Sequence, residues 1–257
     1  MEGAGTPART ERFAVHTYEV DAYGTLALPA LSGYLGEVAG LHAAELGVGL
    51  DALMARGLTW VLVRQRIENP IPVRLGDTID IQTWPSGVDR FAALRDFVVR
   101  RADGTEVARA TTHWSVLDLA TRRPVRPAEV LDARFPREPR PPVVPLTPGK
   151  LPELRAWEFQ KRFHVRYGDI DVNLHVTNTS YVTWALEAVP RDVFQSSRVS
   201  AVEVQFLAEA HHGAAILSRL ARSGERGFSH AIVREEDERE LARVLTTWVP
   251  RAAAGGG

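Results

Sequence analysis

An internal repeat is the feature of this 257-residue chain that most constrains its fold. Four residues of the first half return 150 positions later in the same order and without a gap: Phe13, Val15, Asp21 and Glu37 return as Phe163, Val165, Asp171 and Glu187. Self-similarity at a fixed offset is typical of repeated structural units. The sequence therefore predicts two copies of one domain.

Each copy also carries one amphipathic helix at this offset. Apolar residues at i, i+3, i+4 and i+7 share one face of a helix. They are Leu31, Tyr34, Leu35 and Val38 in the first copy, and Tyr181, Trp184, Ala185 and Ala188 in the second. Gly40 and Pro190 follow at matching places, and we expect them to end the two helices.

Signals for β-strands follow each helix. Residues 79–84 alternate between apolar and polar side chains, as in a half-buried strand. Asp103-Gly104 is a turn signal between two strands. The closing strand at 105–114 corresponds to 241–249 in the second copy. One helix followed by antiparallel strands predicts an α+β fold, with a sheet wrapped round the helix of each copy.

A proline-rich segment separates the two copies. Residues 134–150 contain six prolines, which fix φ and remove backbone donors. We therefore expect an extended, semi-rigid linker between a first domain at 1–133 and a second domain at 151–257.

Composition excludes several kinds of site. The chain has no cysteine, so a disulfide framework, a zinc-thiolate site and a thiol nucleophile are ruled out. A formal net charge of −1 gives no overall case for binding nucleic acid or an anionic membrane. No apolar run is long enough for a membrane span, and the first ten residues do not resemble a secretory signal. We expect a cytoplasmic protein without a metal or cofactor.

The polar residues best suited to catalysis lie just before the second helix. Asp171, Asn173 and His175 are two positions apart, so in an extended chain their side chains point the same way. Candidates for the helix N-cap follow directly, namely Thr177, Asn178 and Thr179. The free amides and the positive end of the helix dipole would suit a developing oxyanion.

The first copy serves as an internal control for this cluster. It has Asp21, Tyr23 and Thr25 at the matching positions, so the Asn and the His occur in the second copy alone. This restriction favours a role in chemistry. The alternative is that Asp171 only holds a turn in both copies and that His175 only packs against its neighbours.

Other polar residues carry weaker signals. Glu209 is a second acidic candidate, with a solvated carboxylate at a strand end as the alternative. The adjacent His211 and His212 would face opposite sides of a strand, so we expect them to be exposed rather than to bind one metal. Residues 227–231 lack the second glycine of a nucleophile elbow. The charged run at 235–240 is expected to be a solvated hairpin turn.

Together these residues resemble the acyl-acyl carrier protein thioesterases, a family with tandem hotdog domains. The motif of the second copy is Asp-Ile-Asp-Val-Asn-Leu-His-Val-Thr-Asn at 169–178, followed by Tyr181, Trp184 and Glu187. In the first copy the likeness lies in residues 58–67, 75–78, 83–84, 95–97 and 109–114. It runs from about residue 13 to residue 249, and short loops and the lack of a transit peptide resemble a bacterial-type member.

The resemblance implies two hotdog domains and the hydrolysis of fatty acyl-acyl carrier protein. The implied catalytic residues, all in the second domain, are Asp171, Asn173, His175 and Glu209. The acyl chain would lie in a tunnel formed mainly by the first domain. Bulky candidates there are Trp60, Trp84 and Phe97, although core packing is the more common role for any one such residue. One departure is Ala210, where plant members usually have a cysteine, so a thiol nucleophile is not available here.

Several alternatives remain open at this point. The chain could be an acyl-CoA thioesterase or an acyl-thioester dehydratase on the same fold, or an acyl-binding module without catalysis. We expect Glu209 and His175 to activate water, with a carboxylate nucleophile as the alternative. The expected partners are the carrier protein and its fatty acyl thioester, with no nucleic acid, and the protein is expected to be a monomer or a homodimer.

Overall fold

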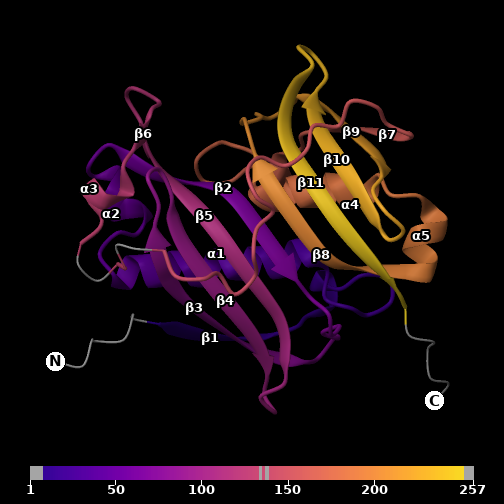
Figure 1. Cartoon of the computed structure of the whole chain (residues 1–257), viewed down its shortest axis with the longest axis horizontal. Coiled ribbons are helices and arrows are strands. Elements are labelled where there is room, and N and C mark those ends of the chain that lie inside the picture. Colours follow the sequence, from indigo (N-terminus) through magenta and orange to yellow (C-terminus); the bar gives the residue numbers. More distant parts are fainter. Residues whose placement is uncertain (1–7, 133–134, 137–138, 252–257) are drawn as a thin grey trace. The chain divides into compact units, whose positions relative to one another are not determined.

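The computed structural model describes residues 8–132, 135–136 and 139–251, and it divides into two compact units, residues 1–146 and 147–257. The border falls inside the proline-rich segment. Each unit has one antiparallel sheet and one main helix (Figure 1). The α+β class expected from the sequence is confirmed.

The first unit begins with β1 (Arg9–Ala14), the 3₁₀ turn η1 (Thr17–Glu19) and the helix α1 (Leu28–Glu45). The elements that follow are α2 (Leu50–Met54), β2 (Leu58–Glu68), β3 (Thr78–Val88), β4 (Ala93–Arg101), β5 (Glu106–Asp118), β6 (Pro124–Val125) and α3 (Pro127–Val130). Strands within this unit are ordered β1-β3-β4-β5-β2, all pairs are antiparallel, and β6 pairs with β5.

The second unit repeats this topology. Its elements are β7 (Phe159–His164), η2 (Tyr167–Asp169), α4 (Asn178–Glu187), α5 (Arg191–Ser196), β8 (Ser197–Phe206), β9 (Ala215–Arg222), β10 (Gly227–Arg234) and β11 (Arg239–Pro250). The strand order is β7-β9-β10-β11-β8, again antiparallel. Numbered within its own unit, each sheet therefore runs first, third, fourth, fifth, second, as expected for two copies of one domain.

The two copies match residue by residue where the chain enters the main helix. The turns η1 and η2 and the starts of α1 and α4 are all separated by 150 positions. The isolated bridges Val20–Leu26 and Ile170–Val176 keep the same offset. The repeat seen in the sequence is thus a 3₁₀ turn, a loop closed by a bridge and a helix start, present once in each unit.

The predicted helical stripe forms the core of the first unit. Leu31, Leu35 and Val38 of α1 are completely buried, as are Ile79 and Ile81 of β3. The alternation of β3 is therefore confirmed. The Asp103-Gly104 turn between β4 and β5 is also confirmed, because Gly104 has a positive φ of 86° that suits glycine.

The prediction that Gly40 ends the first helix is wrong, because α1 continues to Glu45. A glycine inside a helix costs only about 1 kcal/mol relative to alanine. Ala39 before Gly40 and His42 and Ala43 after it are all buried, and this packing offsets the cost. The second helix does end at Glu187, ahead of Pro190 as expected.

The described part of the linker is anchored to each unit in turn. The amides of Arg140, Val143 and Val144 donate to Ser86, Asp96 and Thr111 of the first unit. Thr147 donates to Glu203, and Leu151 donates to Gln205, both within the second unit. Backbone hydrogen bonds therefore fix a segment that has neither helix nor strand at 139–158.

Two histidines are buried, His42 in the first unit and His230 in the second. Nδ1 of His42 lies 3.0 Å from the guanidinium of Arg95, which also donates to Thr83 over 3.2 Å. His230 Nε2 lies 2.9 Å from Thr246 Oγ1. Burial lowers the pKa of His42 to about 4, with the charge of Arg95 adding to the effect, and burial lowers the pKa of His230 to about 3.

These imidazoles predict a loss of stability in mild acid. Both stay neutral in the folded protein, whereas in the unfolded chain they take up protons below an ordinary pKa of 6.5. The unfolded state then binds more protons, so the free energy of unfolding falls as the pH drops from 6.5 towards 4. Thermal melts should show a smaller fall in Tm for His230→Gln than for the wild type over this range. Equal falls would contradict the prediction.

Candidate active site

The segment that contains Asp171, Asn173 and His175 is a tight turn. Asp171 Oδ1 accepts the amide of Asn173 at 2.8 Å and that of His175 at 3.2 Å. The backbone closes the turn, with Asp171 N donating to His175 O over 2.8 Å and Leu174 N donating to Asp171 O over 3.0 Å. The expectation of an extended chain with three aligned side chains is therefore wrong, because the aspartate turns the chain back on itself.

The first copy makes the same turn without the same side chains. Asp21 Oδ1 accepts the amides of Tyr23 and Thr25 at 2.9 and 3.0 Å. The residue three positions after the aspartate has a positive φ in both copies. It is Gly24 in the first copy, with φ of 70°, and Leu174 in the second, with φ of 63°. A left-handed conformation costs a residue with a side chain about 1–2 kcal/mol. The aspartate is thus a shared structural element, and the second copy has accepted backbone strain at this position.

Glu209 lies next to His175. The distance from His175 Nε2 to Glu209 Oε2 is 3.4 Å, and the two side chains are 29% and 33% exposed. Glu209 stands three residues beyond the end of β8, in a loop rather than in a strand. A half-buried carboxylate in contact with an imidazole can accept a proton from a water molecule held beside the pair.

The loop that carries Glu209 is fixed on both sides of that residue. Val176 N donates to Ala210 O over 3.2 Å, and the hydroxyl of Tyr181 lies 3.4 Å from Ala208 O. Ala210 itself is completely buried. Burial raises the pKa of Tyr181 to about 12, so this phenol stays a neutral donor. The loop and the His175 turn are therefore held together by the backbone and by the main helix.

Asn173 contributes through its position. Its backbone N–H donates to Asp171, and the residue is exposed at the tip of the turn. Within the described parts of the chain, the Asn173 side chain makes no hydrogen bond. The side-chain carboxamide can therefore contact a bound molecule.

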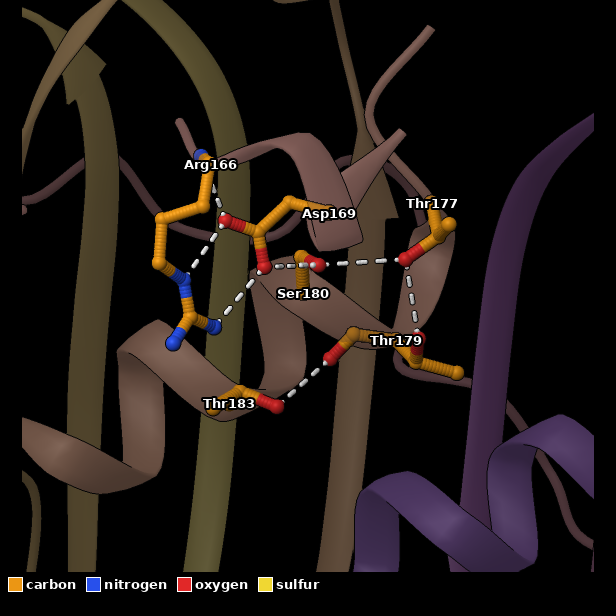
Figure 2. Close-up of polar contacts among 6 residues, drawn as sticks. All are labelled: Arg166, Asp169, Thr177, Thr179, Ser180 and Thr183. Atoms are coloured by element: carbon orange, nitrogen blue, oxygen red, sulfur yellow. Dashed lines mark hydrogen bonds and ion pairs between the residues drawn. The ribbon is translucent and has the colours of Figure 1, made fainter. Parts of the chain in front are cut away.

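The start of α4 is organised around Asp169 (Figure 2). Asp169 accepts hydrogen bonds from the guanidinium of Arg166 and from Ser180 Oγ, at 3.0–3.1 Å. Burial raises the pKa of Asp169, but the hydrogen bonds and charge of Arg166 outweigh this, so the pKa ends below its usual value. The Asp169 carbonyl accepts the Thr177 amide at 2.8 Å, which fixes the direction in which the helix begins.

Thr177 is the N-cap residue, but its hydroxyl does not cap the backbone. The hydroxyl lies 2.9 Å from Thr179 Oγ1 and 3.1 Å from Ser180 Oγ (Figure 2). Because its amide is taken by Asp169, Thr177 is a poor oxyanion donor. Among the described residues, nothing accepts the amides of Asn178 and Thr179, so these two remain as donors.

The three bulky residues of the first unit do not share one surface. Phe97 is completely buried and lies opposite Thr83 in the β3–β4 ladder, whereas Trp84 lies opposite Asp96 on the other face. Trp60 of β2 packs against a cluster that includes Leu46 and Val48, and its indole donates to Val48 O over 2.8 Å. Phe97 and Trp60 therefore belong to packed regions.

Two contacts have no signal in the sequence. His211 is exposed as expected, but its ring lies 5.4 Å from that of His175, at 52°. The buried contact between Arg95 and His42 was not anticipated either. Both pairs join residues far apart in the sequence, so no local sequence pattern predicts them.

Comparison with known proteins places these features in a family. Residues 8–133 match the model of the acyl-ACP thioesterase N-terminal domain, and residues 153–250 match that of the C-terminal domain. An acyl-[acyl-carrier-protein] hydrolase of Cuphea viscosissima is 26% identical over 96% of this chain and 64% of its own length. A palmitoyl-acyl carrier protein thioesterase of Cuphea hookeriana is 27% identical over 94% of this chain and 62% of its own length. The chain thus spans less than two thirds of these plant relatives.

Solved structures agree with this assignment. An acyl-ACP thioesterase from Bacteroides thetaiotaomicron superposes with a TM-score of 0.82 and 25% identity, covering 94% of this chain and 98% of its own. The 12:0-ACP thioesterase from Umbellularia californica has the same fold, with a TM-score of 0.83 and 24% identity. The match covers 95% of this chain and 98% of that one. With two hotdog-type units and both family domains matched in order, the chain belongs to the acyl-ACP thioesterase family.

Proposed function

We propose that this chain hydrolyses fatty acyl-acyl carrier protein to a free fatty acid and the carrier-protein thiol. The observation that carries the proposal is the 3.4 Å contact between His175 and Glu209, at the entrance of α4 in the second unit. The first copy has the same turn but Thr25 in place of His175, so the fold itself does not require this pair.

In the proposed mechanism Glu209 and His175 remove a proton from water as it attacks the thioester carbonyl. The new C–O bond gives a tetrahedral oxyanion, which accepts hydrogen bonds from the amides of Asn178 and Thr179. Collapse of this intermediate breaks the C–S bond. The proton held by the pair then passes to the leaving thiolate, so the pair returns to its starting state.

Asn173 and Asp171 have separate roles in this scheme. The exposed amide group of Asn173 orients the substrate carbonyl. Asp171 acts through the backbone, because its carboxylate holds the amides of Asn173 and His175. Asp171 is therefore a positioning residue.

The acyl chain is proposed to occupy an apolar tunnel formed mainly by the first unit. Each buried CH₂ group contributes about 0.8 kcal/mol, so tunnel length can set the preferred chain length. Trp60, Trp84 and Phe97 stay candidates for its wall, with core packing as the alternative for each. Trp84 and Phe97 lie on opposite faces of the β3–β4 ladder, so they would not line it together.

The other expectations stay predictions. They are a cytoplasmic location and a monomeric or homodimeric state. None of the helices in the described part of the chain is long and apolar enough to cross a membrane. An acyl-CoA thioesterase is the alternative within the same chemistry, and an acyl-binding module is the alternative without chemistry.

Replacing Glu209 by Gln should abolish the reaction. Loss of a general base lowers the rate by about 10²- to 10⁴-fold, so thiol release from acyl-acyl carrier protein should fall by at least about 100-fold. Glu225→Gln, at an exposed turn between β9 and β10, is the matched control and should keep full activity. Turnover that survives in Glu209→Gln would move the base to Asp171 or His175.

The two turn aspartates form a matched pair for a second test. Asp21→Ala and Asp171→Ala each remove an acceptor of two backbone hydrogen bonds, so each should lower the free energy of unfolding by about 1–3 kcal/mol. Thiol release should fall in Asp171→Ala alone, because the first turn carries no catalytic side chain. A similar loss of activity in both variants would argue against the site, and unchanged thiol release in Asp171→Ala would remove Asp171 from the mechanism. A wild type that binds acyl chains but releases no thiol would favour the acyl-binding module.

Isotope labelling separates water attack from a carboxylate nucleophile. A single turnover in heavy-oxygen water should place the label in the fatty acid, since water attacks the carbonyl directly. Mass spectrometry of peptides containing Glu209 and Asp171 should find none. Label in either carboxylate would overturn direct attack by water while leaving the hydrolase function intact.

A further inference from the structure

Two apolar side chains project from the turn that carries His175. Val172 is 86% exposed and Leu174 is 76% exposed, and they flank Asn173. We call Val172 and Leu174 the apolar tip. A single exposed apolar side chain is ordinary on a protein surface. Two further observations separate the tip from that case.

The first copy demonstrates that the turn does not need these side chains. It has Ala22 and Gly24 at the positions of Val172 and Leu174. It nevertheless makes the matching hydrogen bonds from the aspartate to the two amides. The enlarged apolar side chains are therefore an addition to a turn that is complete without them.

The backbone at Leu174 supports the same conclusion. Its φ of 63° lies in the left-handed region, where Gly24 sits without strain in the first copy. A leucine there suffers a clash between Cβ and the backbone, and its exposed side chain gains no burial in return. Strain of this kind concentrates at functional sites, so the side chain is expected to be buried by another molecule.

Three arginines of the second unit are paired with carboxylates, namely Arg166 with Asp169, Arg162 with Glu235 and Arg234 with Asp237. Their charges are partly neutralised by these partners, whereas Val172 and Leu174 offer apolar contact alone.

We propose that the apolar tip is a docking contact for the carrier protein and that it favours carrier-protein thioesters over CoA thioesters. This inference rests on the proposed function. In both substrates a pantetheine arm brings the thioester to His175 and Glu209. Only the carrier protein also presents a folded surface that can cover side chains lying outside the site.

The test is Leu174→Asn. Asparagine tolerates a left-handed φ, so the turn is kept while the apolar group is removed. KM for an acyl-carrier protein should rise about tenfold, with kcat changed by less than about twofold. Turnover of the same acyl chain on CoA should be unchanged. Tyr18→Ser, at an 80% exposed residue of η1 in the first copy, is the matched control and should alter neither substrate.

Binding provides a readout that does not depend on catalysis. Fluorescence anisotropy with labelled holo carrier protein should report weaker binding to Leu174→Asn than to the wild type. If the wild type hydrolyses no thioester but binds the carrier protein through the tip, the proposed function fails and the docking contact stands. If the wild type hydrolyses both substrates and the variant binds carrier protein equally well, the docking contact fails and the function stands.

Three other outcomes would also overturn the docking contact. An equal loss of turnover on carrier-protein and CoA substrates would mean that Leu174 acts through the position of His175. Dissociation of a wild-type dimer in Leu174→Asn, seen by sedimentation, would make a second copy of this chain the occupant. Loss of binding to phosphatidylglycerol vesicles in the variant, with carrier-protein binding intact, would make a lipid surface the occupant.

Discussion

One carboxylate that accepts two main-chain amides determines how each unit enters its main helix. Asp21 and Asp171 make these bonds with nearly the same distances, in turns with different side chains. Because the turn depends on the aspartate and on the backbone, its other side chains can change without loss of the fold. The second unit has used this freedom to place a histidine and an asparagine beside the start of α4.

Much of the fold could be predicted because its signals are periodic and local. The stripe of Leu31, Leu35 and Val38 and the alternation of Ile79 and Ile81 follow directly from which side of an element is buried. The repeat added a second, independent constraint, since one topology had to explain both halves. Comparison of the two halves also singled out the histidine, because a fold requirement alone would not distinguish the copies.

The parts of the fold and site that the sequence did not predict depend on interactions between side chains and backbone or between distant residues. Polar residues at every second position suggested an extended chain at Asp171, but the hydrogen bond from the Asn173 amide to the Asp171 carboxylate makes the chain turn there. Gly40 was expected to end a helix that tertiary packing carries onward. The contact between His175 and Glu209 joins two loops, and only the family resemblance suggested it. The buried Arg95–His42 contact had no signal at all.

Ala210 has a consequence for the redox behaviour of the protein. It is a buried alanine directly after Glu209, and the whole chain has no cysteine and two methionines. One of these, Met54, lies in α2 of the first unit. The groups proposed for catalysis are carboxylate, imidazole and amide, none of which is a thiol. Peroxide and alkylating agents that inactivate thiol-dependent hydrolases therefore find no thiol in this sequence to attack.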